Sequence, residues 1–342
     1  MIFLKELFNK KERLIKKTEH QNPKVREKAV KGLAKIGDSE AVDQLIELLK
    51  DEQFKIRSEA AVALGQIGDS KAVDPLIQAL NDGFTGVKLK AIAALGKIGN
   101  RKAVDAIIQK FKDMDKGGYI RASIRETLKE LGGSKTIDPL TQALKDQNHL
   151  VREQAAWALR SIGDTKVVDP LIQLLKDDNS GVRSAAASTL GQVGDARAVD
   201  PLIHLLKDEN IKDKYYAIEA VGLIGDARAV DPLIPILDDE DYLDVTVEAL
   251  GRIGDAKAVD PLIKVVKAKY GFNIKAIYSL AKIGNPKAVE ALIHFLLDED
   301  TMLRPLAADA LRRIGKEKVL EDPFVQTFPP NVKREFMTLV FK

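Results

Sequence analysis

The sequence predicts an all-α protein, built as a right-handed α-solenoid of about ten stacked helix pairs. A short motif resembling Ile-Gly-Asp recurs along the 342 residues, and its glycines are spaced 29 to 33 residues apart. A repeat period between about 20 and 50 residues is typical of solenoids and related arrays. Apolar and small residues recur at three- and four-residue steps, which is the helical period. A content of 45% hydrophobic and 5% aromatic residues favours packed helices over strands.

Each motif glycine is expected to end a helix. In the second repeat the helical pattern runs from Ile56 to Ile67, and Gly68 follows it. Glycine reaches the left-handed conformation of a helix C-cap without strain, and Asp69 can then cap the next helix. The ten glycines expected in this role are Gly37, Gly68, Gly99, Gly132, Gly163, Gly194, Gly225, Gly254, Gly284 and Gly315.

A shorter apolar segment follows each cap and forms the first helix of the next pair. After Gly68 it runs from Ala72 to Leu80, with Pro75 near its start, where the missing N–H of proline is tolerated. So short a helix is marginal alone, and its neighbours must supply the core. Six segments carry an Asp-Pro pair, beginning at Asp74, Asp138, Asp169, Asp200, Asp231 and Asp260.

The pattern Val-Arg-x-x-Ala-Ala-x-Ala-Leu-Gly-x-Ile-Gly-Asp-x-x-Ala-Val-Asp-Pro-Leu-Ile runs through residues 24 to 316, with Ile56 in the Val place of the second repeat. It resembles the HEAT-like repeats of the phycocyanobilin-lyase (PBS lyase) family, which implies the fold and says little about function. An acidic residue six positions before a basic one resembles the HEAT Asp/Arg ladder. We expect this ladder to tie successive repeats rather than to bind a ligand. Its pairs are Asp51 and Arg57, Asp82 and Lys88, Asp115 and Arg121, Asp146 and Arg152, Asp177 and Arg183, Asp208 and Lys214, and Asp298 and Arg304.

Both ends of the array are expected to be caps, because a solenoid needs its terminal repeats covered. Residues 1–23 suggest an amphipathic basic capping helix with Phe3, Leu4, Leu7, Phe8 and Leu14 facing inward; a membrane-surface or partner-binding helix is the alternative. Residues 317–342 are expected to close the other end. Pro305, Pro323, Pro329 and Pro330 break the pattern there, and Phe324, Phe328, Phe336 and Phe341 fill the last core.

Two irregular intervals interrupt the array. The 33-residue interval contains an enlarged turn over residues 112–119, which is either a tolerated insertion or a contact loop. The 29- and 30-residue intervals coincide with loss of the ladder, because Leu243 and Asn273 occupy the basic position. Altered curvature or a softer joint is expected near residues 236 to 275.

Information about partners is expected in positions that vary between repeats. By resemblance to HEAT solenoids, the helix ending at each motif glycine is the second of its pair and lines a concave surface. In repeats four to eight the variable positions of this helix are aromatic and acidic, which favours a basic or amphipathic peptide segment as partner. Trp157 is the expected anchor; alternatively it fills a gap beside Ser188. The predicted partner-binding residues are Tyr119, Glu126, Glu153, Trp157, Tyr215, Tyr216, Glu219 and Glu248.

The first repeats carry a separate basic patch. Residues 1 to 36 have eleven basic and four acidic side chains, whereas the whole chain has a net charge of only +3. Nucleic-acid binding is an alternative function of this patch, but Glu27 and Glu59 interrupt any continuous phosphate track. The patch residues are Lys24, Lys28, Lys31, Lys35, Lys90 and Lys97.

Catalytic motifs are absent from the sequence. The chain has no cysteine, and its four histidines, His20, His149, His204 and His294, lie in separate repeats. The His-Glu dipeptides of HEAT-fold deoxyhypusine hydroxylases do not occur, nor do phosphate-binding or nucleophile-elbow motifs. A bilin-lyase-like or related accessory enzyme is the alternative that the family resemblance suggests, but the resemblance lies in scaffold positions and implies the fold rather than the chemistry.

The sequence therefore predicts a non-catalytic protein–protein interaction scaffold without a cofactor. Its N-terminus lacks the features of a signal peptide, and no window of 18 apolar residues occurs, so we expect a cytoplasmic protein without a membrane span. The partner is a protein or peptide, and the sequence leaves the oligomeric state open.

Overall fold

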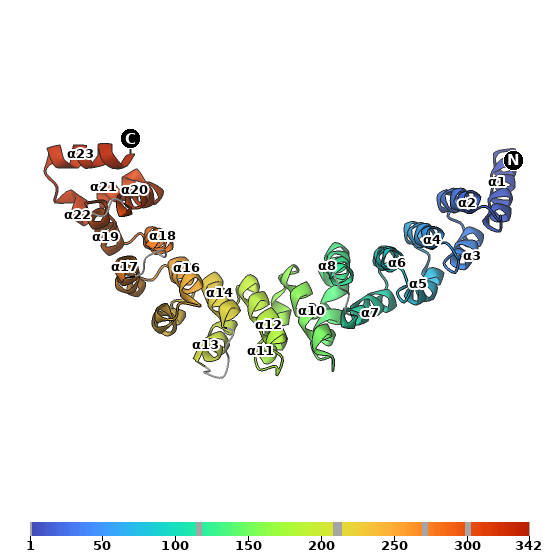
Figure 1. The fold of residues 1–342 in the computed structure, drawn as a ribbon, viewed down its shortest axis with the longest axis horizontal. Helices are drawn as coiled ribbons and strands as arrows, with labels where there is room; N and C mark the ends of the chain where they lie inside the picture. The colour runs from blue at the N-terminus through green and yellow to red at the C-terminus, as the bar shows by residue number, and fades with distance from the viewer. Residues whose placement is uncertain (1, 114–117, 208–213, 269–272, 298–301, 342) are drawn as a thin grey trace. The chain divides into compact units, whose positions relative to one another are not determined.

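A computed structural model describes residues 2–113, 118–207, 214–268, 273–297 and 302–341, without the side chains of residues 2–8, 134 and 273. Helices and turns are the only structure in these ranges, which confirms the all-α prediction (Figure 1). The chain forms two units, residues 1–170 and 171–342, each described by itself.

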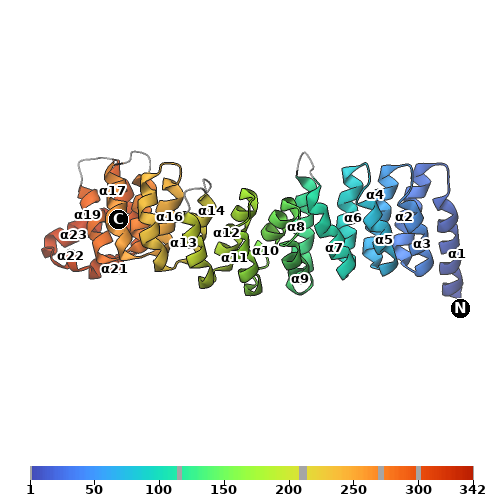
Figure 2. The same cartoon turned by 90° about the horizontal axis from the view of Figure 1, so that it is seen from below.

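The first unit consists of helix pairs that follow one another along the chain. Figure 2 shows α1 to α6 standing side by side. The helices are α1 (Ile2–Thr18), α2 (Pro23–Ile36), α3 (Ser39–Leu48), α4 (Phe54–Ile67), α5 (Val73–Ala79), α6 (Thr85–Ile98), α7 (Arg101–Gln109), α8 (Tyr119–Leu131), α9 (Gly133–Ala143), α10 (His149–Arg160) and the start of α11 (Val168–Leu174).

The second unit continues the same alternation and ends in three additional helices. Its helices are α12 (Ser180–Val193), α13 (Val199–Lys207), α14 (Tyr215–Ile224), α15 (Val230–Leu233), α16 (Leu243–Ile253), α17 (Val259–Ala268), α18 (Asn273–Ile283), α19 (Pro286–Leu297), α20 (Leu303–Ile314), α21 (Lys316–Glu321), α22 (Pro323–Gln326) and α23 (Pro330–Phe341). In α15 the helix stops after four residues and becomes a 3-10 helix over Ile234–Asp238, with Pro235 at its start.

The predicted caps are present. All ten motif glycines have positive φ, between 51° and 100°. In five repeats the aspartate after the glycine then caps a single 3-10 turn that leads into the first helix of the next pair. Asp69, for example, accepts a hydrogen bond from the backbone N–H of Lys71 at 2.9 Å. The motif Gly-Asp therefore ends one helix and starts the next.

A second glycine, three positions before the capping glycine, sets the distance between consecutive second helices. A Cβ added to Gly65 of α4 would lie 2.6 Å from the Cα of Ala94 on α6. In the second unit, a Cβ added to Gly191 of α12 would lie 2.6 Å from the Cα of Ala220 on α14. Neither position has room for a methyl group, so the helices approach backbone to backbone.

The ladder ties repeats together as expected. Within the pair Asp51 and Arg57, the carboxylate contacts an arginine of the preceding repeat and the guanidinium contacts an aspartate of the following repeat. Arg57 donates to both carboxylate oxygens of Asp82 in the next repeat, at 2.6 and 3.0 Å. A third nitrogen of Arg57 donates to the backbone carbonyls of Asp51 and Glu52, at 2.7 and 3.1 Å. One guanidinium therefore satisfies a turn in its own repeat and holds the carboxylate of the following repeat.

The ladder begins one repeat earlier than the sequence suggested. Arg26 donates to the Asp51 carboxylate at 2.7 and 3.1 Å and to the carbonyls of His20 and Gln21. Arg26 has no acidic residue six positions before it, so the sequence pattern missed it. Asp115, Asp208 and Asp298 lie outside the described residues.

In the described regions, the helices at both ends pack on their neighbours. Lys11 of α1 pairs with Asp38 and Glu40 at 2.9 and 2.7 Å, and Leu14 packs against Gly32 of α2. The inward orientation expected for Phe3, Leu4, Leu7 and Phe8 lies outside the described side chains. At the other end, the rings of Phe324, Phe328 and Phe336 form a chain with centroids 5.3 and 5.6 Å apart.

One expectation about the end of the array is wrong. Pro305 does not break the pattern, because it is the third residue of α20. In the first turn of a helix the missing N–H of proline has no intrahelical partner to lose. Pro323 and Pro330 are helix-starting residues for the same reason.

The close approach at Gly65 predicts a stability defect. Gly65→Ala is expected to lower the free energy of unfolding by about 1–3 kcal/mol, because the new methyl group meets backbone that cannot move aside. Urea unfolding followed by circular dichroism measures the change. Gly83→Ala is the matched control, since nothing lies within 4 Å of a Cβ added there. Equal midpoints for the two variants would contradict the close-packing interpretation.

The ladder predicts a pH-dependent contribution to stability. The hydrogen bonds from Arg57 hold the pKa of Asp82 below its ordinary value. A carboxyl whose pKa is lower in the folded state stabilises the protein above its unfolded pKa, about 4, and loses that contribution as the pH falls further. Asp82→Asn is therefore expected to cost about 2 kcal/mol at pH 7 and progressively less below about pH 4.

Unfolding midpoints in urea at neutral pH and near pH 3 test this expectation. Asp74→Asn is the control, because Asp74 and Lys102 form an exposed ion pair, with side chains 65% and 63% exposed. Exposed pairs contribute at most about 1 kcal/mol. The same loss at both pH values in Asp82→Asn would show that the charge of Asp82 is not what stabilises the ladder.

Candidate interaction surfaces

Each unit presents two rows of helices. In the first unit the second helices α2, α4, α6 and α8 form one row and the first helices α3, α5 and α7 form the other; the second-helix row lies on the inner side of this unit's curve (Figure 1). Side chains that vary between repeats project from both rows. The candidate sites are therefore compared row by row.

In the first unit, the predicted partner-binding residues lie on α8 and α10. Tyr119 is the first residue of α8 and is 67% exposed. Glu126, seven residues further along the same helix, is also exposed, and its carboxylate lies 3.9 Å from the ammonium group of Lys129. Trp157 of α10 is half-buried, with the Arg160 guanidinium 5.7 Å from its ring centroid. Glu153 is half-buried and accepts a hydrogen bond from Gln154 at 3.1 Å. We call these four residues the aromatic–acidic strip.

The other four predicted residues belong to the second unit. Tyr215 is 45% exposed, Tyr216 is half-buried, and their rings meet edge to face with centroids 5.4 Å apart. Glu219 is half-buried on the same helix, α14, and Glu248 of α16 pairs with Arg252 at 2.8 Å. None of the three large aromatic residues, Trp157, Tyr215 and Tyr216, is fully buried. Tyr215 and Tyr216 lie in a different unit from Trp157, so the two groups are treated as separate surfaces.

The six residues of the predicted basic patch are all exposed on second helices of the first unit. Lys31 forms an ion pair with Glu27 at 2.7 Å. A groove of about 310 Å³ lies between α2 and α4 beside them, lined by Val30, Lys31, Ala34, Lys35, Glu59, Val62, Ala63 and Gln66. The lysines of α2 therefore border a groove with apolar residues in its lining, which the sequence analysis did not predict.

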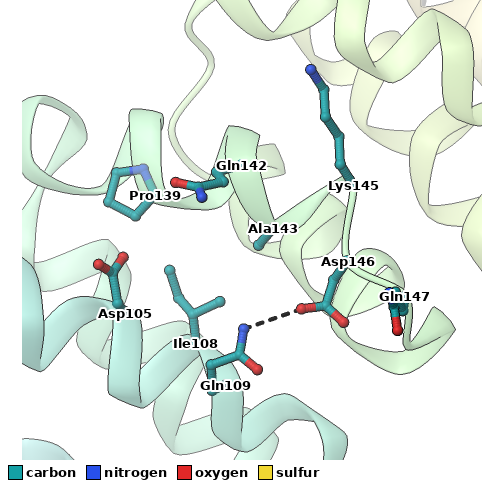
Figure 3. Close-up of a pocket in the computed structure, with 9 residues that line it drawn as sticks. All are labelled: Asp105, Ile108, Gln109, Pro139, Gln142, Ala143, Lys145, Asp146 and Gln147. Carbon is teal, nitrogen blue, oxygen red and sulfur yellow. Dashed lines mark hydrogen bonds between the residues drawn. The ribbon is translucent and has the colours of Figure 1, made fainter.

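A larger groove lies on the first-helix row, between α7 and α9 (Figure 3). It measures about 710 Å³, whereas the groove between α3 and α5 measures about 230 Å³ and the groove between the 3-10 helix Ile234–Asp238 and α17 about 210 Å³. Ile108, Pro139 and Ala143 supply its apolar lining. Its polar lining consists of Asp105, Gln109, Gln142, Lys145, Asp146 and Gln147.

A break in the ladder accompanies this wide groove. Arg121 stands where Arg57 stands in its own repeat and Asp146 where Asp82 stands, but Arg121 forms no hydrogen bond or ion pair with any described residue. Asp146 instead accepts a hydrogen bond from Gln109 at 3.1 Å, across the groove (Figure 3). The equivalent of the Arg57–Asp82 contact is therefore absent at this joint among the described residues. The 33-residue interval before this joint was the available signal.

Sequence reasoning also missed an aromatic pair. Phe54 at the start of α4 and Phe84 before α6 stack with centroids 4.8 Å apart and remain 39% and 51% exposed. Arg57 lies 5.5 Å from the centre of the Phe84 ring, so the pair packs on the ladder. Both phenylalanines follow a ladder aspartate by two or three residues, which is the pattern that could have indicated them.

The described residues contain no catalytic arrangement that we recognise. No group of three or more His, Asp or Glu side chains within them could hold a metal ion. His20 accepts a hydrogen bond from the N–H of Asn22, and His294 lies against Glu290 and Phe324. In the regions covered by the structure, no helix combines the length and apolarity needed to cross a bilayer.

Comparison with known proteins identifies the family. The family model for HEAT repeats matches residues 12–84, 73–160, 137–213, 199–275 and 269–322. The chain therefore belongs to the HEAT-repeat family. A comparison with curated proteins found no match.

Several solved structures are similar to this chain. An engineered protein is 21% identical, with a TM-score of 0.44, and the match covers 90% of this chain and 99% of that one. Human deoxyhypusine hydroxylase is 21% identical, with a TM-score of 0.34, over 74% and 98% of the two chains. Kap121p bound to Nup53p is 16% identical, with a TM-score of 0.54, over 96% and 46%. At these identities the likeness concerns the fold alone.

Proposed function

We propose that this protein is a non-catalytic scaffold that binds a protein or peptide partner on its second-helix row. The observation that carries the proposal is the aromatic–acidic strip, where Tyr119 is 67% exposed and Trp157 is only half-buried. Tryptophan and tyrosine are enriched among residues that dominate binding energy. The adjacent carboxylates of Glu126 and Glu153 favour a basic or amphipathic segment and speed its approach.

The distribution of the family consensus also supports binding rather than bilin chemistry. The consensus residues Ala60, Ala61 and Leu64 of the second repeat are fully buried. Residues of this kind build the core and contact no ligand. The resemblance to phycocyanobilin-lyase repeats is therefore explained by packing, and lyase activity is not part of the proposal.

Protein partners are consistent with the fold. Kap121p, which shares the fold at a TM-score of 0.54, was solved bound to Nup53p and to Ste12p. We take from this likeness only that the fold is compatible with a protein partner. The chemistry of the segment is inferred from the strip itself.

Substitution of the strip tests the proposal. Trp157→Ala combined with Tyr119→Ala is expected to weaken partner binding by at least about tenfold, since hot-spot truncations commonly cost 2 kcal/mol or more. Partners are first identified by crosslinking and mass spectrometry from native lysate, and the affinity of the purified partner is then measured by calorimetry. Leu339→Ala is the control, because Leu339 is an apolar residue that is 59% exposed on α23 and belongs to the other unit. A correctly folded double variant with unchanged affinity would refute the strip as the binding surface.

A further inference from the structure

The basic patch contains a carboxylate-binding arrangement that the protein already uses internally. Lys31 donates to the Glu27 carboxylate at 2.7 Å. This hydrogen bond lowers the pKa of Glu27, and the nearby charges of Lys55 and Lys24 lower it further. Lys31 thus binds one half-buried carboxylate, and two further lysines, Lys24 of α2 and Lys55 of α4, add positive charge near it. Their arrangement stabilises negative charge at this place on the second-helix row.

The lysines of α2 have a regular spacing. Lys24, Lys28, Lys31 and Lys35 stand at positions i, i+4, i+7 and i+11, so they lie along one face of the helix. At 1.5 Å per residue the row is about 17 Å long, equivalent to three helical turns. Lys24, Lys28 and Lys35 form no ion pair with any residue that the structure describes. These three cations therefore remain available for a partner.

The groove between α2 and α4 supplies an apolar surface beside this row. Val30 and Ala63 are buried in its floor, Val62 and Ala34 are half-buried, and Lys35 and Glu59 stand at its edges. An apolar floor bordered by regularly spaced cations matches the two faces of an amphipathic helix whose polar side is acidic.

We propose that the α2/α4 groove is a docking site for an acidic amphipathic helix of a protein partner. Apolar side chains of that helix pack on Val62 and Ala34, and carboxylates at i, i+4 or i, i+7 pair with Lys28 and Lys35. This surface is separate from the aromatic–acidic strip and has the opposite charge preference. The test of this docking site is therefore independent of the test of the proposed function.

A protein helix fits the groove better than nucleic acid does. The carboxylates of Glu27 and Glu59 stand among the lysines and would repel a phosphate backbone, which presents negative charge along its whole length. A phosphate backbone also has nothing to place on Val30, Ala34, Val62 and Ala63. An amphipathic helix can place its carboxylates opposite the lysines alone and bury its apolar face in the groove.

A synthetic helix provides a direct test on the full chain. The probe is a fluorescent, side-chain-stapled peptide of about four turns, with glutamates at i, i+4, i+7 and i+11 and leucines along one adjacent face. Fluorescence anisotropy measures its affinity. A scrambled peptide of the same composition, which has no apolar face, is expected to bind more weakly.

The lysines of α6 offer a matched control. Lys28→Glu with Lys35→Glu is expected to weaken probe binding by at least about tenfold, because two favourable contacts become repulsive. Lys90→Glu with Lys97→Glu reverses two equally exposed lysines with the same seven-residue spacing on the same row, and is expected to change affinity by less than about twofold. Val62→Ser, which removes apolar surface from the floor, is expected to weaken the probe without changing the charge.

Four outcomes would overturn the docking site. They are equal affinity for the probe and its scrambled form, unchanged affinity in Lys28→Glu with Lys35→Glu, an equal loss in the α6 control, and displacement of the probe by a short DNA duplex at lower concentration than by unlabelled peptide. The last would identify the patch as a nucleic-acid surface. Circular dichroism confirms that each variant retains its helices.

Discussion

The closeness of consecutive second helices is the constraint on which the rest of each unit depends. At Gly65 and Gly191 one helix touches the backbone of the next, so the spacing of the row is set by atoms that cannot move aside. The ladder then holds the opposite ends of the same helices, through guanidinium groups that bridge a carboxylate and two carbonyls. With spacing and ends both fixed, the remaining positions of the second helices are free to differ between repeats.

This division explains how much could be predicted from the sequence. Helix ends were predictable, because the conformation at Gly68 or Gly194 depends on local backbone sterics and recurs with the motif. The existence of a ladder of Asp–Arg contacts between repeats was predictable, because its residues recur at the same positions in successive repeats. Its start at Arg26 was not, because the pattern required an acidic partner six residues earlier, whereas the observed contact runs forward to Asp51.

The surfaces were less predictable than the scaffold. The lysines of α2 and the aromatic residues of α8 and α10 were located from their variation between repeats, but the groove beside Lys35 depends on how far α2 and α4 stand apart. The wide groove between α7 and α9 lies at a joint where, among the described residues, Gln109 rather than Arg121 donates a hydrogen bond to Asp146. A sequence pattern indicates which side chains could form a contact. Whether they form it depends on small differences in the positions of the helices, and the sequence pattern does not specify these positions.

The exposed charges of the first unit differ from one second helix to the next, and Lys129 gives α8 an exposed cation beside its carboxylates. Lys90 and Lys97 of α6 are exposed, and so are Glu126 and Glu130 of α8, the following second helix. The change falls at the enlarged repeat, close to the joint where the ladder tie is missing. A row that carries both signs of charge attracts a uniformly charged chain at some positions and repels it at others.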